Sequence, residues 1–140
     1  MYLIDTNVLS ELRNPGRADS NVRSWSVRAR EAELHISVVT VLELERGVLA
    51  IERRDQPQGV RLRAWLEAHV IEPFRERTLP IDVAKARRCA MLHVPNPRPE
   101  RDALIAATAL VHGMTIVTRN VSDFEVTGVS LLNPWDPQKA

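Results

Sequence analysis

Short strand-like runs alternate with longer helical patterns along the whole chain, and this alternation constrains the fold more than any other feature of the sequence. The strand-like runs are residues 2–4, 34–36, 78–81, 114–117 and 129–132. Between them, apolar residues recur at helical spacing, most clearly over residues 37–54 and 100–112. Strands separated by helices predict a parallel sheet that is covered by helices on both faces.

Turn-forming residues mark where the helices between these strands begin and end. Asn14-Pro15-Gly16 ends a short helix over residues 8–13, and Gly113 is the expected C-cap of the helix over residues 100–112. Residues 55–59 contain proline and glycine and are expected to break the chain between two helices. The remaining helices are expected over residues 19–30, 60–71 and 82–93.

Length and composition predict a single folded domain over residues 1–140. The hydrophobic share of 44% and the charged share of 26% are typical of a folded chain rather than a disordered one. A chain of 140 residues has room for one core, and the sequence contains no repeat or linker that would divide it.

The bulk properties exclude several classes of protein. The net charge of +1 favours neither a nucleic acid nor a membrane surface as partner. No apolar run is long enough to cross a bilayer, and the first residues do not resemble a secretion signal. Cys89 is the one cysteine, which excludes an intrachain disulfide and a cysteine-based zinc site. These features predict a cytoplasmic protein without membrane contact, in which Cys89 is a buried, inert thiol.

Four acidic residues are expected to meet at one edge of the predicted sheet. Asp5 ends the first strand, Glu43 lies in the helix after the second, and Asp123 lies in the turn after residues 114–117. Asp102 lies in the first turn of the helix over residues 100–112. The carboxyl ends of parallel strands share one edge, where ligands bind. Crowded carboxylates repel one another, and a divalent cation, here Mg²⁺ or Mn²⁺, is the usual compensation.

Each of the four acids also has a purely structural interpretation. Thr40-x-x-Glu43 matches a capping box, in which Glu43 bonds back to the amide of Thr40. The helix dipole alone favours Asp102 in a first helical turn. Asp5 and Asp123 each fit an ordinary turn. Taken singly, each acid favours its structural interpretation, and the case for a metal site depends on their joint occurrence.

Four motifs and a C-terminal stretch cover nearly the whole chain in order. They are Leu3-Ile4-Asp5-Thr6-Asn7-Val8-Leu9-Ser10-Glu11, residues 37–47, Asp102-Ala103-Leu104-Ile105-Ala106-Ala107-Thr108-Ala109, residues 117–124 and the stretch from Gly128 to Trp135. With these motifs the chain resembles the PIN-domain ribonucleases, specifically the VapC-type toxins of bacterial toxin–antitoxin pairs. The resemblance implies an α/β, PIN-like three-layer fold with a central parallel sheet, and an acidic pocket for one or two Mg²⁺ or Mn²⁺ ions. It also implies endonucleolytic cleavage of RNA, often tRNA or another structured RNA.

The resemblance further implies roles for individual residues. Asp5, Asp102 and Asp123 correspond to direct or water-mediated metal ligands, and Glu43 to an outer ligand or a group that orients or deprotonates water. Some relatives carry the last acid at the position of Asn120 instead. Residues expected to orient the carboxylates are Thr6, Asn7, Thr118 and Asn120. Thr6 or Asn7 alternatively caps the first helix. Residues expected to contact RNA phosphate are Arg101 and Arg119.

The expected partners also follow from the resemblance. A small cognate antitoxin is expected to cover the pocket, with a basic side chain among the carboxylates, and a homodimer is expected. Three other functions stay open. One is a catalytically weak RNA- or protein-binding module of the same fold, and one is hydrolysis of DNA. The third is a phosphatase with Asp5 as nucleophile, but this chemistry normally uses a second aspartate where this chain has Asn7.

Overall fold

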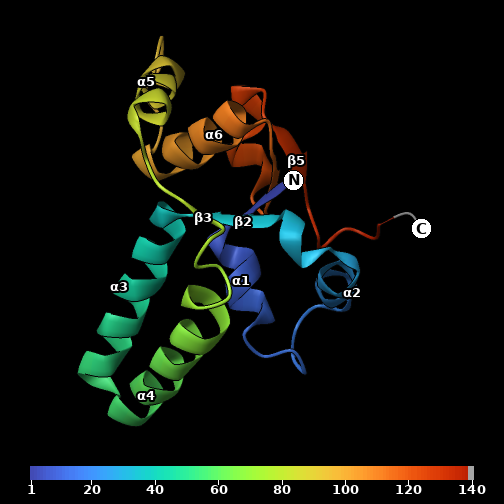
Figure 1. Ribbon diagram of the computed structural model, residues 1–140, viewed down its shortest axis with the longest axis vertical. Coiled ribbons are helices and arrows are strands. Elements are labelled where there is room, and N and C mark those ends of the chain that lie inside the picture. Colours follow the sequence, from blue (N-terminus) through green and yellow to red (C-terminus); the bar gives the residue numbers. More distant parts are fainter. Residues whose placement is uncertain (139–140) are drawn as a thin grey trace.

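A five-stranded parallel sheet forms the centre of the molecule in the computed structural model, which describes residues 1–138 (Figure 1). The strand order is β3-β2-β1-β4-β5 and every pairing is parallel. The strands are β1 (Tyr2–Ile4), β2 (Leu34–Ser37), β3 (Thr78–Leu79), β4 (Thr115–Val117) and β5 (Ser130–Leu132). The parallel sheet predicted from the alternation of strands and helices is therefore confirmed.

Helices cover both faces of the sheet (Figure 1). One face carries α1 (Thr6–Leu12), α2 (Ser20–Arg28), α3 (Val38–Arg54) and α4 (Gln56–Trp65). The other face carries α5 (Val83–Leu92) and α6 (Glu100–His112). Short helical segments complete the chain: η1 (Glu31–Glu33), η2 (Leu66–Ile71), η3 (Val121–Asp123) and η4 (Glu125–Thr127). The result is the predicted three-layer α/β architecture.

Alternate residues of the central strand supply the two halves of the core. Ile4 packs with residues of α1, α2 and α3, whereas Leu3 packs with residues of α6. Side chains of a strand point alternately to its two faces, so one three-residue strand anchors both helical layers. The carboxyl end of this central strand, and the residue that follows it, is consequently held from both sides.

One predicted boundary in this half of the molecule is wrong. Residues 55–59 were expected to break the chain, but α4 already begins at Gln56, with the side chain of Asp55 capping the amide of Gln58. Gly59 therefore lies inside the helix. A β-carbon on Gly59 would lie 2.6 Å from Cα of Glu52 in α3, so the missing side chain permits close packing of the two helices rather than a turn. The helix expected over residues 60–71 also changes to a π-helix at Leu66.

Within residues 1–138, no helix combines the length and the apolar character needed to span a membrane.

Candidate active site

Asp5 lies immediately after β1, at the carboxyl edge of the sheet, and is fully buried. Its amide donates to the carbonyl of Val117 in β4, so the sheet itself fixes its backbone. Its carboxylate accepts hydrogen bonds from the amide of Thr6 (2.8 Å), Nδ2 of Asn7 (3.2 Å) and Oγ1 of Thr118 (2.8 Å). Since an isolated buried carboxylate costs several kcal/mol, these donors are what allow Asp5 to remain inside the protein.

Glu43 reaches the same place from α3, the helix that follows the neighbouring strand β2. Its Oε1 accepts a hydrogen bond from Oγ1 of Thr6 at 2.8 Å, which links α3 to the first residue of α1. The N-cap of α3 is Ser37, whose hydroxyl accepts from the amide of Val39. Thr40 lies inside the helix, so the alternative of a Thr40–Glu43 capping box does not apply, and Glu43 faces the sheet edge instead.

Asp102 and Arg101 come from the first turn of α6, on the opposite face of the sheet. The side chain of Asp102 is 16% exposed and that of Arg101 is 28% exposed. Pro99 is the N-cap of α6, and the hydrogen bonds of Arg101 to Asp5 and Glu43 show that the first turn of the helix lies at the carboxyl edge of the strands. Three of the four predicted acids, Asp5, Glu43 and Asp102, are thus joined at one site by the fold.

The guanidinium of Arg101 lies between these three acids. Its Nε donates to both carboxylate oxygens of Glu43 at 3.0 Å, and its Nη1 donates to Oδ1 of Asp102 at 3.1 Å. Its Nη2 donates to Oδ1 of Asp5 and, at 3.4 Å, to Oγ1 of Thr6. We call Asp5, Glu43, Asp102 and Arg101 the acid centre. Burial disfavours the charged form of Arg101, but hydrogen bonds to Glu43 and Asp5 outweigh that effect and raise its pKa above the ordinary value.

The other predicted site residues fall into two groups. Thr6, Asn7 and Thr118 contact the acids directly, and Asn7 also accepts from the amide of Arg119 at 3.2 Å. Neither Thr6 nor Asn7 caps α1, because the cap is Asp5 itself.

The second group lies further out. The Arg119 guanidinium stands over the ring of Trp135, 5.1 Å from its centroid. Asn120 donates its backbone amide to Oγ1 of Thr118. Asp123 is exposed in η3, and its side chain accepts no hydrogen bond from the described part of the chain. Its backbone amide donates to the carbonyl of Asn120 and closes the turn.

The donor chemistry of the acid centre fits a divalent cation. All three acids offer carboxylate oxygens, which Mg²⁺ and Mn²⁺ prefer, and they face one point that already holds a positive group. A groove of about 390 Å³ leads away from this point between α1, α3 and α4, lined among others by Thr6, Glu43 and Gly47. The guanidinium of Arg101 stands in for the cation that such a cluster requires.

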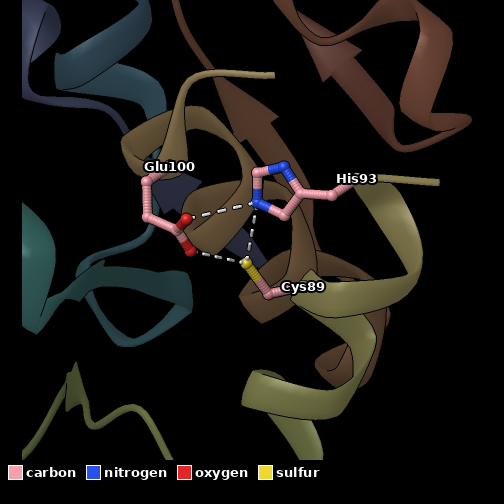
Figure 2. Close-up of side chains that lie close together, drawn as sticks. All are labelled: Cys89, His93 and Glu100. Atoms are coloured by element: carbon pink, nitrogen blue, oxygen red, sulfur yellow. Dashed lines mark hydrogen bonds and ion pairs between the residues drawn. The ribbon is translucent and has the colours of Figure 1, made fainter. Parts of the chain in front are cut away.

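A second cluster of potential metal ligands, which the sequence interpretation missed, joins α5 to α6 (Figure 2). The thiol of Cys89 donates to Oε1 of Glu100 at 3.3 Å and lies 3.8 Å from Nε2 of His93. The same imidazole nitrogen lies 3.4 Å from Oε2 of Glu100. We call these three residues the Cys89 cluster. The spacing of Cys89 and His93, four residues apart in a predicted helix, was the available signal, since such residues share a helix face.

Hydrogen bonding shows that the Cys89 cluster is satisfied without a metal. Zinc would hold sulfur, nitrogen and oxygen donors about 3.4–3.6 Å apart, which is close to what is observed. However, the amide of Arg98 donates to Nδ1 of His93 at 3.2 Å, which makes Nδ1 the acceptor nitrogen and leaves the proton of a neutral ring on Nε2. A ligating histidine needs the opposite arrangement. Burial, with a hydrogen bond to Glu100, also raises the pKa of Cys89 to about 11.

Comparison with known proteins identifies the family. The model of the PIN domain matches residues 2–128, and the chain belongs to the PIN-domain family. It is 35% identical to the VapC ribonuclease Y4jK of Sinorhizobium fredii, over 98% of this chain and 99% of the relative. It is 33% identical to the toxin FitB of Neisseria gonorrhoeae, over 96% and 99% of the two chains. The resemblance to VapC-type toxins is therefore confirmed.

Solved structures agree with the fold. The crystal structure of FitAcB from Neisseria gonorrhoeae superposes with a TM-score of 0.88 at 31% identity, covering 96% of this chain and 99% of the other. The structure of FitAB bound to a DNA fragment gives the same TM-score at 29% identity and covers 99% of each chain.

Proposed function

We propose that this chain is a Mg²⁺- or Mn²⁺-dependent endoribonuclease toxin, restrained by a cognate antitoxin, whose reaction takes place at the acid centre. One observation carries this proposal: Asp5, Glu43 and Asp102, which are 38 to 97 residues apart in the sequence, converge on a single cationic group. Family membership supplies the substrate class, since similar proteins are named ribonucleases and toxins. Because the proposed substrate is RNA, we propose that the protein acts in the cytoplasm.

A divalent cation at this centre would neutralise charge on the scissile phosphate and supply an acidified water as nucleophile. Asp5 and Asp102 are the residues that would hold it. The carboxylate of Asp5 is fixed in position by hydrogen bonds from Thr6, Asn7 and Thr118. Glu43 lines the groove beside the centre, and its proposed role is to orient or deprotonate the attacking water.

The outer residues keep the supporting roles that the sequence suggested. Thr6 orients Glu43, whereas Asn7 and Thr118 orient Asp5. Asp123 is proposed to act through water, because its exposed side chain stands free of the hydrogen-bond network that joins the other three within residues 1–138. Asn120, in the same turn, is proposed to form a hydrogen bond with the site, and Arg119 is proposed to contact RNA phosphate.

The expected partners are likewise proposals. FitB is present with FitA in the similar structures, one of which contains DNA. We infer that this chain also pairs with a small antitoxin, that the pair forms around a homodimer of the toxin, and that it binds DNA as a complex. The groove beside Glu43 is the surface on which the antitoxin would cover the acid centre.

Cleavage of RNA by the purified chain tests the proposal. Total RNA would be incubated with the protein and Mg²⁺, with EDTA and the variant Asp102→Asn as controls, and the new ends mapped by sequencing. We expect 5′-phosphate and 3′-hydroxyl ends, because water rather than the ribose 2′-hydroxyl attacks. Asp102 is a better choice than Asp5 for this control, because Asp5 also caps α1 and is fully buried.

Two results would contradict the proposal. Cleavage that survives both EDTA and Asp102→Asn would exclude a metal-carboxylate mechanism. Cleavage of single-stranded DNA at the same rate, with no preference for RNA, would change the substrate class while leaving the site in place. Circular dichroism of the variant keeps loss of activity separate from loss of fold.

A further inference from the structure

The acid centre contains its own basic residue, and its contacts point to a role beyond binding RNA. We propose that Arg101 occupies the metal position of the metal-free protein as a resident counter-cation, and that a divalent cation must displace its guanidinium in order to bind. This inference rests on the proposed function, because it requires a metal at the acid centre. Arg101 then regulates metal loading of the same site.

Charge explains both why Arg101 is held and why a metal can replace it. The three carboxylates of Asp5, Glu43 and Asp102 carry −3 in total, and the single guanidinium of Arg101 reduces this to −2. A divalent cation in the same position would reduce it to −1. The metal therefore compensates one more charge than Arg101 does, at a site where one acid is wholly removed from water and repulsion is weakly screened.

The three acids lie further apart around Arg101 than the ligands of one metal ion would. Oxygen atoms bound to one Mg²⁺ lie about 2.1 Å from it, and hence about 3 Å from their neighbours in octahedral geometry. Among residues 1–138, the group with three ligand atoms all within 4.8 Å of one another is the Cys89 cluster, and not the three acids. A planar guanidinium with a donor toward each carboxylate is wider than a metal ion. A metal held by Asp5 and Asp102 would consequently have to displace Arg101, which lies between them.

The side chains differ in their freedom to move, and this difference assigns the movement to Arg101. Asp5 is fully buried and keeps three hydrogen bonds after Arg101 has left, from Thr6, Asn7 and Thr118. Arg101 is partly exposed, has a long flexible side chain, and makes all its described side-chain hydrogen bonds to the acid centre and Thr6. Once displaced, it stands beside Asp102 at the mouth of the site, where it can pair with a phosphate.

Metal titration of matched variants tests the displacement. Calorimetric titration of Mn²⁺ into the metal-free chain would compare the wild type with Arg101→Met, which keeps a side chain of similar length but removes the charge. Arg88→Met is the control, since Arg88 is exposed on α5 and forms no ion pair in the described part of the chain. We expect Arg101→Met to bind Mn²⁺ at least about tenfold more tightly, because charge-assisted hydrogen bonds no longer compete, and Arg88→Met to change affinity less than twofold.

A measurement on the wild-type protein covers the case in which Arg101→Met fails to fold, and separates displacement from a simple charge effect. Arginine Nε–H signals can be followed by ¹H–¹⁵N NMR as Mg²⁺ is added. We expect the Arg101 signal to be protected from exchange in the metal-free protein and to become exchange-exposed on saturation. A signal that stays protected at saturating Mg²⁺, or equal Mn²⁺ affinity of the wild type and Arg101→Met, would overturn the inference alone. Absence of binding in both proteins would overturn it together with the proposed function.

Discussion

The acid centre and the Cys89 cluster both gather potential metal ligands within a few ångströms of the first turn of α6, yet they balance their polar groups in opposite ways. In the Cys89 cluster, the thiol is a neutral donor to the carboxylate of Glu100, and His93 can donate from Nε2, so the acid is satisfied by its neighbours. In the acid centre, three carboxylates face one another and need an added cation, which Arg101 supplies. Proximity of ligand atoms alone therefore does not define a metal site, and the proposed metal site is based on the unbalanced charge of the acid centre.

The largest expected difference between the two regions is in catalysis. Asp102→Asn should lower Mg²⁺-dependent RNA cleavage by at least about 100-fold, because loss of a direct ligand should exceed the roughly 10–100-fold loss seen when an outer partner is removed. Glu100→Gln, two residues away in the same helix, should change the rate less than twofold. Initial rates on one labelled RNA would measure both. Similar losses in the two variants would place the Cys89 cluster in the reaction.

Stability should separate the two regions by a smaller margin. Thr118→Val removes the hydroxyl that donates to the buried carboxylate of Asp5, and we expect it to lower the free energy of unfolding by about 1–3 kcal/mol. Cys89→Ser keeps a donor toward the exposed Glu100 and should cost less than about 1 kcal/mol. Urea unfolding in EDTA would compare the two variants. A larger loss of unfolding free energy in Cys89→Ser than in Thr118→Val would show that the Cys89 cluster contributes more to stability than the hydrogen bond to Asp5.

The smallest expected effect concerns pH and is confined to the Cys89 cluster. The pKa of Cys89 is raised to about 11 by burial and by Glu100, so its alkylation should accelerate only as the pH approaches that value. Since the folded pKa lies above the unfolded one, the stabilisation that this group contributes is present below about pH 8.5 and is lost as the pH rises toward 11. Glu100→Gln should shift the alkylation midpoint downward. An unchanged midpoint would mean that burial alone sets the pKa.

Much of the fold and part of the site could be predicted from the sequence, because both depend on local patterns. The strand β1 and the helix α6 have the bounds that their apolar runs, Pro99 and Gly113 indicate. The carboxyl ends of parallel strands meet at one edge of a sheet. Acids near those ends are therefore expected to lie together, and Asp5, Glu43 and Asp102 do. The predicted inert, buried Cys89 is also found buried in α5.

The remaining features depend on contacts between distant elements, which no local pattern records. Gly59 lies in a stretch of turn-forming residues, but it is part of α4, because its lack of a side chain allows α3 to pack closely against it. The Thr40–Glu43 capping motif is present in sequence, but Ser37 begins the helix and Glu43 faces Arg101. The position of Arg101 depends on the meeting of α6 with β1 and α3, and the sequence interpretation expected it to contact RNA phosphate rather than the three acids.

The most direct test of where the metal binds is a Mn²⁺ titration of three proteins, followed by the electron paramagnetic resonance of free Mn²⁺. The wild type and Cys89→Ser should bind Mn²⁺ with the same stoichiometry and with affinities within about twofold of each other, because the Cys89 cluster is satisfied without metal. Glu43→Gln should bind at least about tenfold more weakly, because one of the three charges of the acid centre is lost. Unchanged binding in Glu43→Gln with loss of binding in Cys89→Ser would contradict the assignment of the metal to the acid centre.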